Sequence, residues 1–151
     1  MLKEIKIGDR IILFGKLYRI LIKHRGLILM IEMNVDKMIF KWEHETVLSA
    51  FLNRNEAVID TSEETQYPIE RLTDDEKASI RMIRDYIENA LNQMYPNWDV
   101  LASKKTKPEL RGLEEKIGCA KSTLVRYLRV YLQSGRNEYA LIDKRRMYLG
   151  I

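Results

Sequence analysis

The chain has 151 residues, of which 46% are hydrophobic and 32% charged, and these fractions are typical of a folded protein and exclude a disordered one. No apolar run approaches the roughly 20 residues that a membrane span needs, and the charged start MLKEIKIGDR does not fit a signal peptide, so we expect no membrane association. The single cysteine excludes a disulfide within the chain and fits a cytoplasmic protein.

Charge is strongly segregated along the chain. Residues 1–42 contain nine Lys and Arg and four Asp and Glu, whereas residues 43–76 contain two Lys and Arg and ten Asp and Glu. Residues 77–102 contain three of each kind, and residues 103–151 contain twelve Lys and Arg and five Asp and Glu. Clustered Lys and Arg gain affinity for phosphates by releasing counterions, so the basic C-terminal third fits a segment that binds a polyanion. A solvated basic face explains the charge equally well, and charge alone leaves both interpretations open.

The first forty residues contain four short runs rich in Ile, Leu, Tyr and Phe: RIILF, LYRILIK, LILMIEM and KMIFKW. Each break between them holds a glycine, or Asn and Asp, which tolerate a positive φ. Alternation in the second run places Tyr18, Ile20 and Ile22 on one side. These runs predict a small antiparallel sheet or barrel.

The sheet is followed by a segment, EHETVLSAFLN, whose apolar spacing predicts a helix. We expect Val47, Phe51 and either Leu48 or Leu52 on its inward face. EAVID then reads as a closing strand, and together these elements define a β-rich domain over residues 1–60.

Residues 61–102 are interpreted as a linker and a long amphipathic helix. TSEETQYPIERL has no periodicity and predicts a loop. Thr73 and Glu76 then form the capping-box pattern that begins a helix over residues 73–95, which Pro96 ends. Its buried stripe is predicted to consist of Ile80, Ile83, Ile87, Leu91 and Met94.

Residues 103–151 are interpreted as a helix-turn-helix domain with a basic tail. Pro108 suits the first turn of one helix, Gly118 suits the left-handed residue that ends it, and a second helix runs from Lys121 to Ser134. The inward residues of the first helix are expected to be Leu110, Leu113 and Ile117. Any helical hairpin shares this pattern, so spacing alone leaves both interpretations open. The overall fold class is therefore predicted to be α+β.

The second helix has two chemically different sides. On a helical wheel Leu124, Leu128 and Tyr131 share one face. The opposite face, about 140 to 200 degrees away, carries Ser122, Arg126, Arg129 and Gln133. These donors suit base edges and phosphates in a major groove, although a solvated outer face would also be polar. The scarcity of acids in residues 116–146 favours DNA.

Two stretches resemble a known family. IGCAKSTLVRYLRVYLQSGRNEYALIDKRR resembles the helix-turn-helix of TnsB-family transposases, the DDE transposases of Tn-seven-like elements, which are related to the Mu-phage transposase. IGDRIILFGKLYRILIKHRGLILMIEM resembles the N-terminal sheet of that family, with its pattern G-D…G-K…Y-R-I-L. The two stretches occur in the expected order and the resemblance spans most of the chain.

The resemblance implies sequence-specific binding of the repeats at transposon ends. In that family this region positions a separate RNase H-like domain that cuts and joins DNA with magnesium, and nothing in this chain matches that domain. We therefore expect an N-terminal fragment, or a stand-alone equivalent, that is not an enzyme, has no cofactor or metal site of its own and is a monomer. Its expected partners are double-stranded DNA and other transposition proteins.

The candidate site residues fall into two groups. The base-reading candidates are Lys121, Ser122, Thr123, Arg126 and Arg129. The DNA-backbone candidates are Lys104, Lys105, Lys107, Tyr127, Arg136, Lys144, Arg145 and Arg146. No catalytic residues are assigned, because no paired carboxylates, Ser/His/Asp set or phosphate-binding glycine loop is evident. A transcriptional regulator with a helix-turn-helix, and a protein-interaction module of a transposition complex, remain the alternatives.

Overall fold

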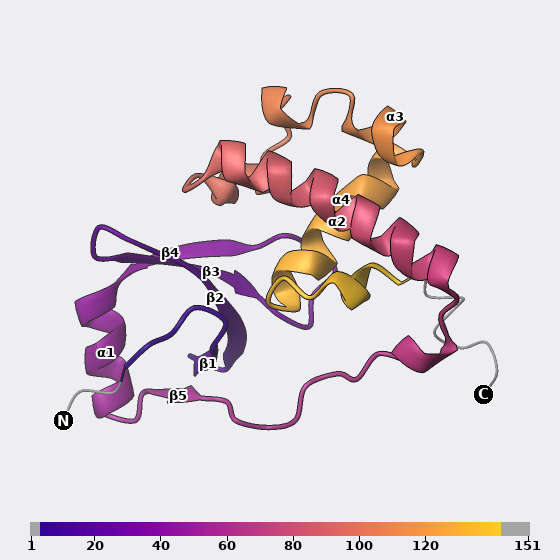
Figure 1. Cartoon of the computed structure of the whole chain (residues 1–151). Helices are drawn as coiled ribbons and strands as arrows, with labels where there is room; N and C mark the ends of the chain where they lie inside the picture. Colours follow the sequence, from indigo (N-terminus) through magenta and orange to yellow (C-terminus); the bar gives the residue numbers. More distant parts are fainter. Residues whose placement is uncertain (1–3, 143–151) are drawn as a thin grey trace. The chain divides into compact units, whose positions relative to one another are not determined.

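The computed structural model describes residues 4–142, and these form an α+β fold with one five-stranded antiparallel sheet and four α-helices (Figure 1). The predicted fold class is confirmed. The chain divides into two units. The sheet unit contains residues up to 63 and residues 96–105, and the helical unit contains residues 64–95 and those from 106 onward. The long helix thus groups with the C-terminal helices, so the units do not follow the three consecutive segments of the sequence-based division.

Five short strands make up the sheet. They are β1 Arg10–Leu13, β2 Lys16–His24, β3 Leu27–Glu32, β4 Phe40–His44 and β5 Ala57–Ile59, in the order β4-β3-β2-β1-β5. The first four strands follow one another as an antiparallel meander, as the sequence predicts. The strand β5 pairs with β1, so the predicted closing strand is also confirmed.

The first two of the three connections in the meander are turns of two residues, Phe14-Gly15 and Arg25-Gly26. Both Phe14 and Arg25 have a positive φ, of 50° and 51°, as do the glycines that follow them. Such turns match the twist of the flanking strands. The expectation that Phe14 ends a strand is wrong, because Leu13 already pairs with Lys16 across the turn.

A β-bulge changes the face that β2 presents. Ile20 pairs with Met30, but Ile22 pairs with Leu29, so Leu21 has no partner in the register. Neighbouring residues of β3 point to opposite faces of the sheet, and paired residues point to the same face. The prediction that Ile22 shares a side with Ile20 is therefore wrong, because the extra residue moves Ile22 to the other face.

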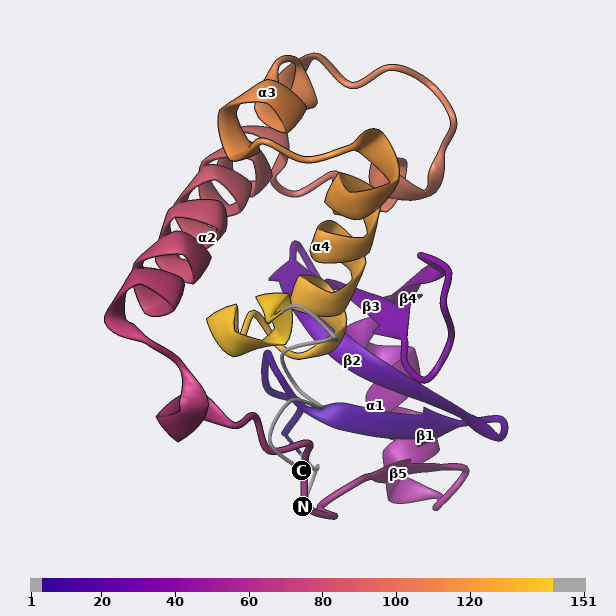
Figure 2. The same ribbon diagram turned by 90° about the vertical axis from the view of Figure 1, so that its right-hand side faces the viewer.

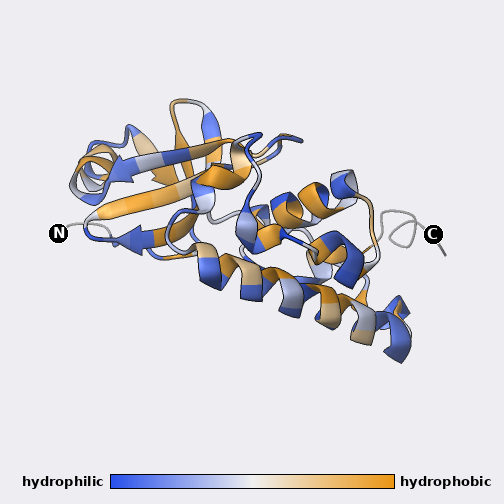
Figure 3. Ribbon diagram, turned by 90° about the horizontal axis from the view of Figure 1, so that it is seen from above, coloured by the Kyte–Doolittle hydropathy of each residue, from blue (hydrophilic) through white to orange (hydrophobic). Residues whose placement is uncertain are grey.

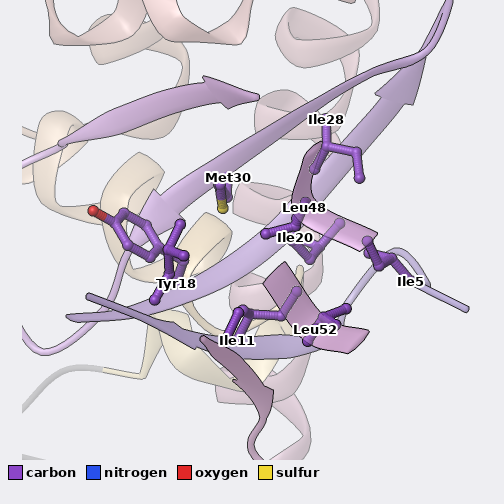
Figure 4. Packing of buried hydrophobic residues seen from close by; sticks show 10 residues of the cluster. Ile5, Ile11, Tyr18, Ile20, Ile28, Met30, Leu48 and Leu52 are labelled. Atoms are coloured by element: carbon purple, nitrogen blue, oxygen red, sulfur yellow. The ribbon is translucent and has the colours of Figure 1, made fainter. Parts of the chain in front are cut away.

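One face of the sheet packs against α1, Glu45–Asn53, around a buried cluster (Figure 4). The cluster consists of Ile5, Ile11, Leu13, Tyr18, Ile20, Ile28, Met30, Leu48, Leu52 and Ala57. Both leucines of α1 are fully buried, and Phe51 packs partly against them. Val47 was expected on the inward face but is 38% exposed, because the pair Leu48 and Leu52 lies at the centre of the buried stripe and Val47 falls beside it.

The sheet unit also contains the 3-10 helix η2, Trp98–Ala102, which contacts β4. Its Trp98 and Leu101 are buried. The side chain of Arg19 is buried as well, and its Nη1 donates a hydrogen bond of 2.7 Å to the carbonyl of Gly8. This bond satisfies a charged group that would otherwise be costly to bury.

The helical unit is built on α2, Asp74–Met94 (Figure 2). Thr73 and Glu76 form both hydrogen bonds of the predicted capping box, 3.1 Å and 3.0 Å long. Polar and apolar bands alternate along α2 (Figure 3), and its buried residues are Ile80, Ile87, Ala90, Leu91 and Met94. The predicted stripe is thus confirmed except at Ile83, which is half-buried.

Five 3-10 and α segments complete this unit. A 3-10 helix, η1 Ile69–Arg71, precedes α2, and the segments η3 Pro108–Leu110, α3 Leu113–Ile117, α4 Lys121–Gln133 and η4 Glu138–Leu141 follow it. The helix α2 packs against η3, α3 and η4, and α4 also packs against η4.

Replacement of a fully buried leucine of α1 tests this core. We expect Leu48→Ala to lower the free energy of unfolding by about 2–5 kcal/mol, because it leaves a cavity under the sheet. Denaturant unfolding followed by circular dichroism measures this change. The control Val47→Ala removes a half-exposed side chain and should change the free energy by only about 0.5 kcal/mol. Equal effects of the two substitutions would contradict the placement of α1.

Candidate nucleic-acid interface

The segment α3-turn-α4 positions the candidate site residues. Gly118, with a φ of 79°, is the left-handed residue that ends α3, as predicted. The N–H groups of Gly118 and Cys119 both donate to the carbonyl of Glu114, which closes the helix end. After two further residues α4 begins at Lys121, and it ends at Gln133, one residue before the predicted end.

The helix before the turn is shorter than the sequence predicts. The continuous helix expected from Pro108 is interrupted, because Gly112 has a φ of 74° and Arg111 is extended. What remains is η3 and, after the interruption, the five-residue helix α3. Leu113 is buried as expected, whereas Leu110 and Ile117 are only half-buried. The structure therefore contains a short helix, a turn and a longer helix.

The inward face of α4 is wholly apolar apart from one hydroxyl. Leu124, Leu128 and Tyr131 are buried, as the helical wheel predicts, and Leu132 is buried beside them. This face packs against η4, where Ala140 and Leu141 are also buried. Because this side of α4 is filled, only the opposite side is open to a ligand.

The outward side of α4 carries three of the five base-reading candidates. Ser122 is exposed there, and Arg126 and Arg129 are half-buried. The other two, exposed Lys121 and half-buried Thr123, lie in the first turn, about 60 and 100 degrees from Leu124 on either side of it. No Asp or Glu occurs within α4, so the three outward candidates form one acid-free row.

Contacts within α4 hold both of its arginines along the helix. The guanidinium of Arg126 lies over the ring of Tyr127, 5.0 Å from the ring centroid. The Nη1 of Arg129 donates a hydrogen bond of 3.2 Å to Oε1 of Gln133. Such contacts reduce the rotamer freedom that each side chain loses when it binds a ligand.

The prediction missed one residue of this outward side. Val125 is 43% exposed although it is apolar. On the wheel it lies about 100 degrees from Leu124, between Lys121 and Arg129. The position of Val125 on the helix follows from the sequence, but the predicted site included only polar side chains. A methyl-bearing side chain there adds an apolar contact to a row of charges.

The backbone candidates are more dispersed than the base-reading candidates. Lys107 and Tyr127 belong to the helical unit and are half-buried, whereas Lys104 and Lys105 are exposed and belong to the sheet unit. The structure thus does not collect these four in one unit. Three further candidates, Lys144, Arg145 and Arg146, lie outside the described residues.

The last backbone candidate, Arg136, is bound to an acid. Its Nε donates to Oε1 of Glu88 at 2.9 Å, and its Nη2 pairs with Oε2. The hydroxyl of Tyr131 donates to Oε1 of the same carboxylate. A phosphate contact by Arg136 would therefore have to coexist or compete with Glu88.

The pKa values of this cluster reflect its hydrogen bonds. Burial raises the pKa of the Glu88 carboxyl, but the bonds from Arg136 and Tyr131 lower it by more, so the net pKa lies below the usual value. Burial and the bond to Glu88 together raise the pKa of the Tyr131 hydroxyl. Arg81 and Arg84 of the same helix pair with Glu138, at 3.7 Å and 3.4 Å. The bonds of Glu88 join α2 to α4 and to the residues just after it, and the pairs with Glu138 join α2 to η4.

Within residues 4–142 no group of three or more His, Cys, Asp or Glu is arranged to hold a metal ion. Of the helices described, none is long and apolar enough to cross a membrane. No protein-family model matches the chain, and no curated protein matches it significantly.

The Glu88 cluster leads to a prediction about pH. Because the folded state lowers the pKa of Glu88, its stabilisation is present above the ordinary glutamate pKa of about 4.3 and is lost as the pH falls through the folded value. We expect Glu88→Gln to lower the free energy of unfolding at pH 7 by about 1–3 kcal/mol and to flatten its decline in acid.

Denaturant unfolding at a series of pH values from 7 to about 3 tests this expectation. Glu115→Gln is the matched control, because Glu115 is an exposed carboxylate that forms no ion pair among the described residues. A Glu88→Gln profile that overlays the unsubstituted chain over this range would show that the cluster does not stabilise the fold.

Proposed function

We propose that the chain binds double-stranded DNA through α4, as the DNA-binding part of a TnsB-like transposase that recognises transposon ends. The observation that carries this proposal is the two-sided character of α4. One side is buried and apolar, and the other presents Ser122, Arg126 and Arg129, with Lys121 exposed in the first turn and no acid in the helix. A helix that served only packing would have no need of this composition.

The dimensions of α4 suit a groove. Its thirteen residues span roughly 20 Å, and the major groove of B-form DNA, about 12 Å wide, admits one α-helix. Ser122, Arg126, Arg129 and Gln133 are spaced by three or four residues and therefore form one row along the helix. An arginine in such a row can donate two hydrogen bonds to one guanine. A serine can donate a hydrogen bond to a base edge or accept one from it.

The transposon-end assignment rests on the sequence resemblance. Under this proposal the chain binds and positions DNA, and cutting and joining belong to a separate catalytic domain with its magnesium ions. The chain then needs no cofactor, works in the cytoplasm and binds DNA as a monomer, with other transposition proteins as further partners. An obligate dimer on a palindromic site would instead support the transcriptional regulator.

The double variant Arg126→Ala with Arg129→Ala tests the proposal. Binding to the terminal repeats that flank the gene is compared with binding to a shuffled duplex, at two salt concentrations, by fluorescence anisotropy. We expect tighter binding to the repeats, weaker binding at higher salt, and at least about a tenfold loss in the double variant, because each lost bidentate contact costs about 1–3 kcal/mol.

The control removes the same charge elsewhere. Lys6→Ala with Lys37→Ala eliminates two exposed cations of the sheet unit and should leave the preference for the repeats intact. If the chain binds no duplex even at low salt, the proposal fails and a protein partner takes its place. Equal losses in both double variants would indicate a non-specific basic surface.

Val125 adds a test of how α4 meets bases. We expect its methyl groups to contact the methyl group of a thymine, as apolar side chains do in the major groove. Replacing single thymines of the bound repeat by uracil should weaken binding of the unsubstituted chain at one position and leave binding of Val125→Ala unchanged there. An equal uracil effect in both proteins would contradict this contact.

A further inference from the structure

The hairpin turn between β1 and β2 contains an exposed aromatic residue in a costly conformation. Phe14 has a φ of 50° and is 67% exposed. Turns with two successive positive φ values favour Asn-Gly, because asparagine tolerates the left-handed region and a bulky side chain does not. The fold therefore holds a large apolar ring in solvent at a position where asparagine would be more stable. Backbone strain of this kind clusters at functional sites.

The ring of Phe14 is part of a group of aromatic and cationic side chains. Phe51, from α1, meets it edge to face, with centroids 5.4 Å apart and an interplanar angle of 74°. The Nζ of Lys41, from β4, lies 5.8 Å from the Phe14 centroid. The guanidinium of Arg54, just after α1, lies 5.6 Å from the Phe51 centroid. We call these four residues the Phe14 platform.

The charges around the platform favour an anionic ligand. Lys41 forms no ion pair with any residue in 4–142, and its Nζ lies against the ring of Phe14. Arg54 pairs with Glu56 at 3.4 Å, and Lys16, beside the turn, pairs with Glu32 at 3.6 Å while remaining largely exposed. Residues 1–42, which supply Phe14 and Lys41, hold nine Lys and Arg against four Asp and Glu. Residues 43–76, which supply Phe51 and Arg54, hold two against ten, so the anionic preference rests on Lys41, Arg54 and Lys16 themselves.

We propose that the Phe14 platform binds single-stranded nucleic acid, with an unpaired base stacked on Phe14 and the neighbouring phosphate bound by Lys41. Stacking on aromatic rings beside cations is how single strands are held without sequence preference. An exposed ring supplies the stacking surface, and Phe51 supports it from the side. This site lies in the sheet unit and is distinct from α4, so it does not depend on duplex binding by the helical unit.

The decisive variant is Phe14→Asn, because it separates folding from binding. Asparagine suits the positive φ at this position, so the thermal midpoint should stay the same or rise. The stacking surface is lost, so affinity for a single strand should fall at least about tenfold. Anisotropy of labelled oligothymidylate and oligouridylate of about 12 nucleotides measures binding, and the two probes distinguish DNA from RNA.

Three further variants complete the test. Phe14→Trp should retain binding, and Lys41→Ala should weaken it and reduce its dependence on salt. The control Ile7→Asn makes the same replacement at another exposed apolar residue of the sheet unit, 61% exposed, and should bind as the unsubstituted chain does.

Two outcomes would overturn the proposal. One is the absence of binding to either single-stranded probe at low salt. The other is unchanged binding by Phe14→Asn together with a lower thermal midpoint, which would mean that the ring only stabilises the hairpin. The double variant Arg126→Ala with Arg129→Ala should keep its affinity for single strands, so failure of duplex binding is told apart from failure of this site.

Discussion

The carboxylate of Glu88 is the interaction on which the helical unit depends. It accepts hydrogen bonds from Tyr131 on the buried face of α4 and from Arg136 just beyond the end of that helix. The bond to Tyr131 fixes the rotation of α4 about its own axis. The bond to Arg136 fixes the turn that follows the C-terminal end of α4. Because the inward side of α4 is defined in this way, its outward side is defined too, and Arg126 and Arg129 acquire a common direction. A single partly buried acid thus helps the buried leucines of α4 to fix the direction of its outward side.

The two units present cations in different chemical settings. On α4 the guanidinium groups lie along a helix whose other side is filled, which suits the regular edge of a duplex. In the sheet unit an amine and a guanidinium lie against aromatic rings, which suits a flat ligand with a nearby negative charge. Net charge alone does not separate these settings. The distinction comes from what each cation touches, and it is the basis on which we propose different ligands for the basic N-terminal segment and the basic C-terminal third.

Local chemistry in the sequence was sufficient to predict the capping box at Thr73, the left-handed Gly118 and the buried face of α4. Each depends on residues only three or four positions apart. The bulge at Leu21 and the bonds of Glu88 were not predicted, because each depends on partners that become neighbours only in the fold. The break at Gly112 was missed although its signal, a glycine with a positive φ, is local. Glu88 lies 43 and 48 residues from its two partners, and in sequence it is one more polar residue of an amphipathic helix. The sequence therefore predicted which side of α4 is buried, but it did not predict the contacts with Glu88 that keep α4 in this orientation.

The bulge in β2 changes the phase of an alternating strand. Without the bulge, which leaves Leu21 unpaired, Ile22 would point toward α1 and Lys23 would point away from it. With it, Lys23 reaches the α1 side, where its Nζ donates to the carbonyl of Ile5 at 3.0 Å and pairs with Glu45 at 3.3 Å. The unpaired Leu21 thus lets a charged side chain hold both the N-terminal segment and the start of α1. Removal of Leu21 should leave Lys23 facing α1, whereas a second unpaired residue in β2 would turn every side chain beyond it to the other face.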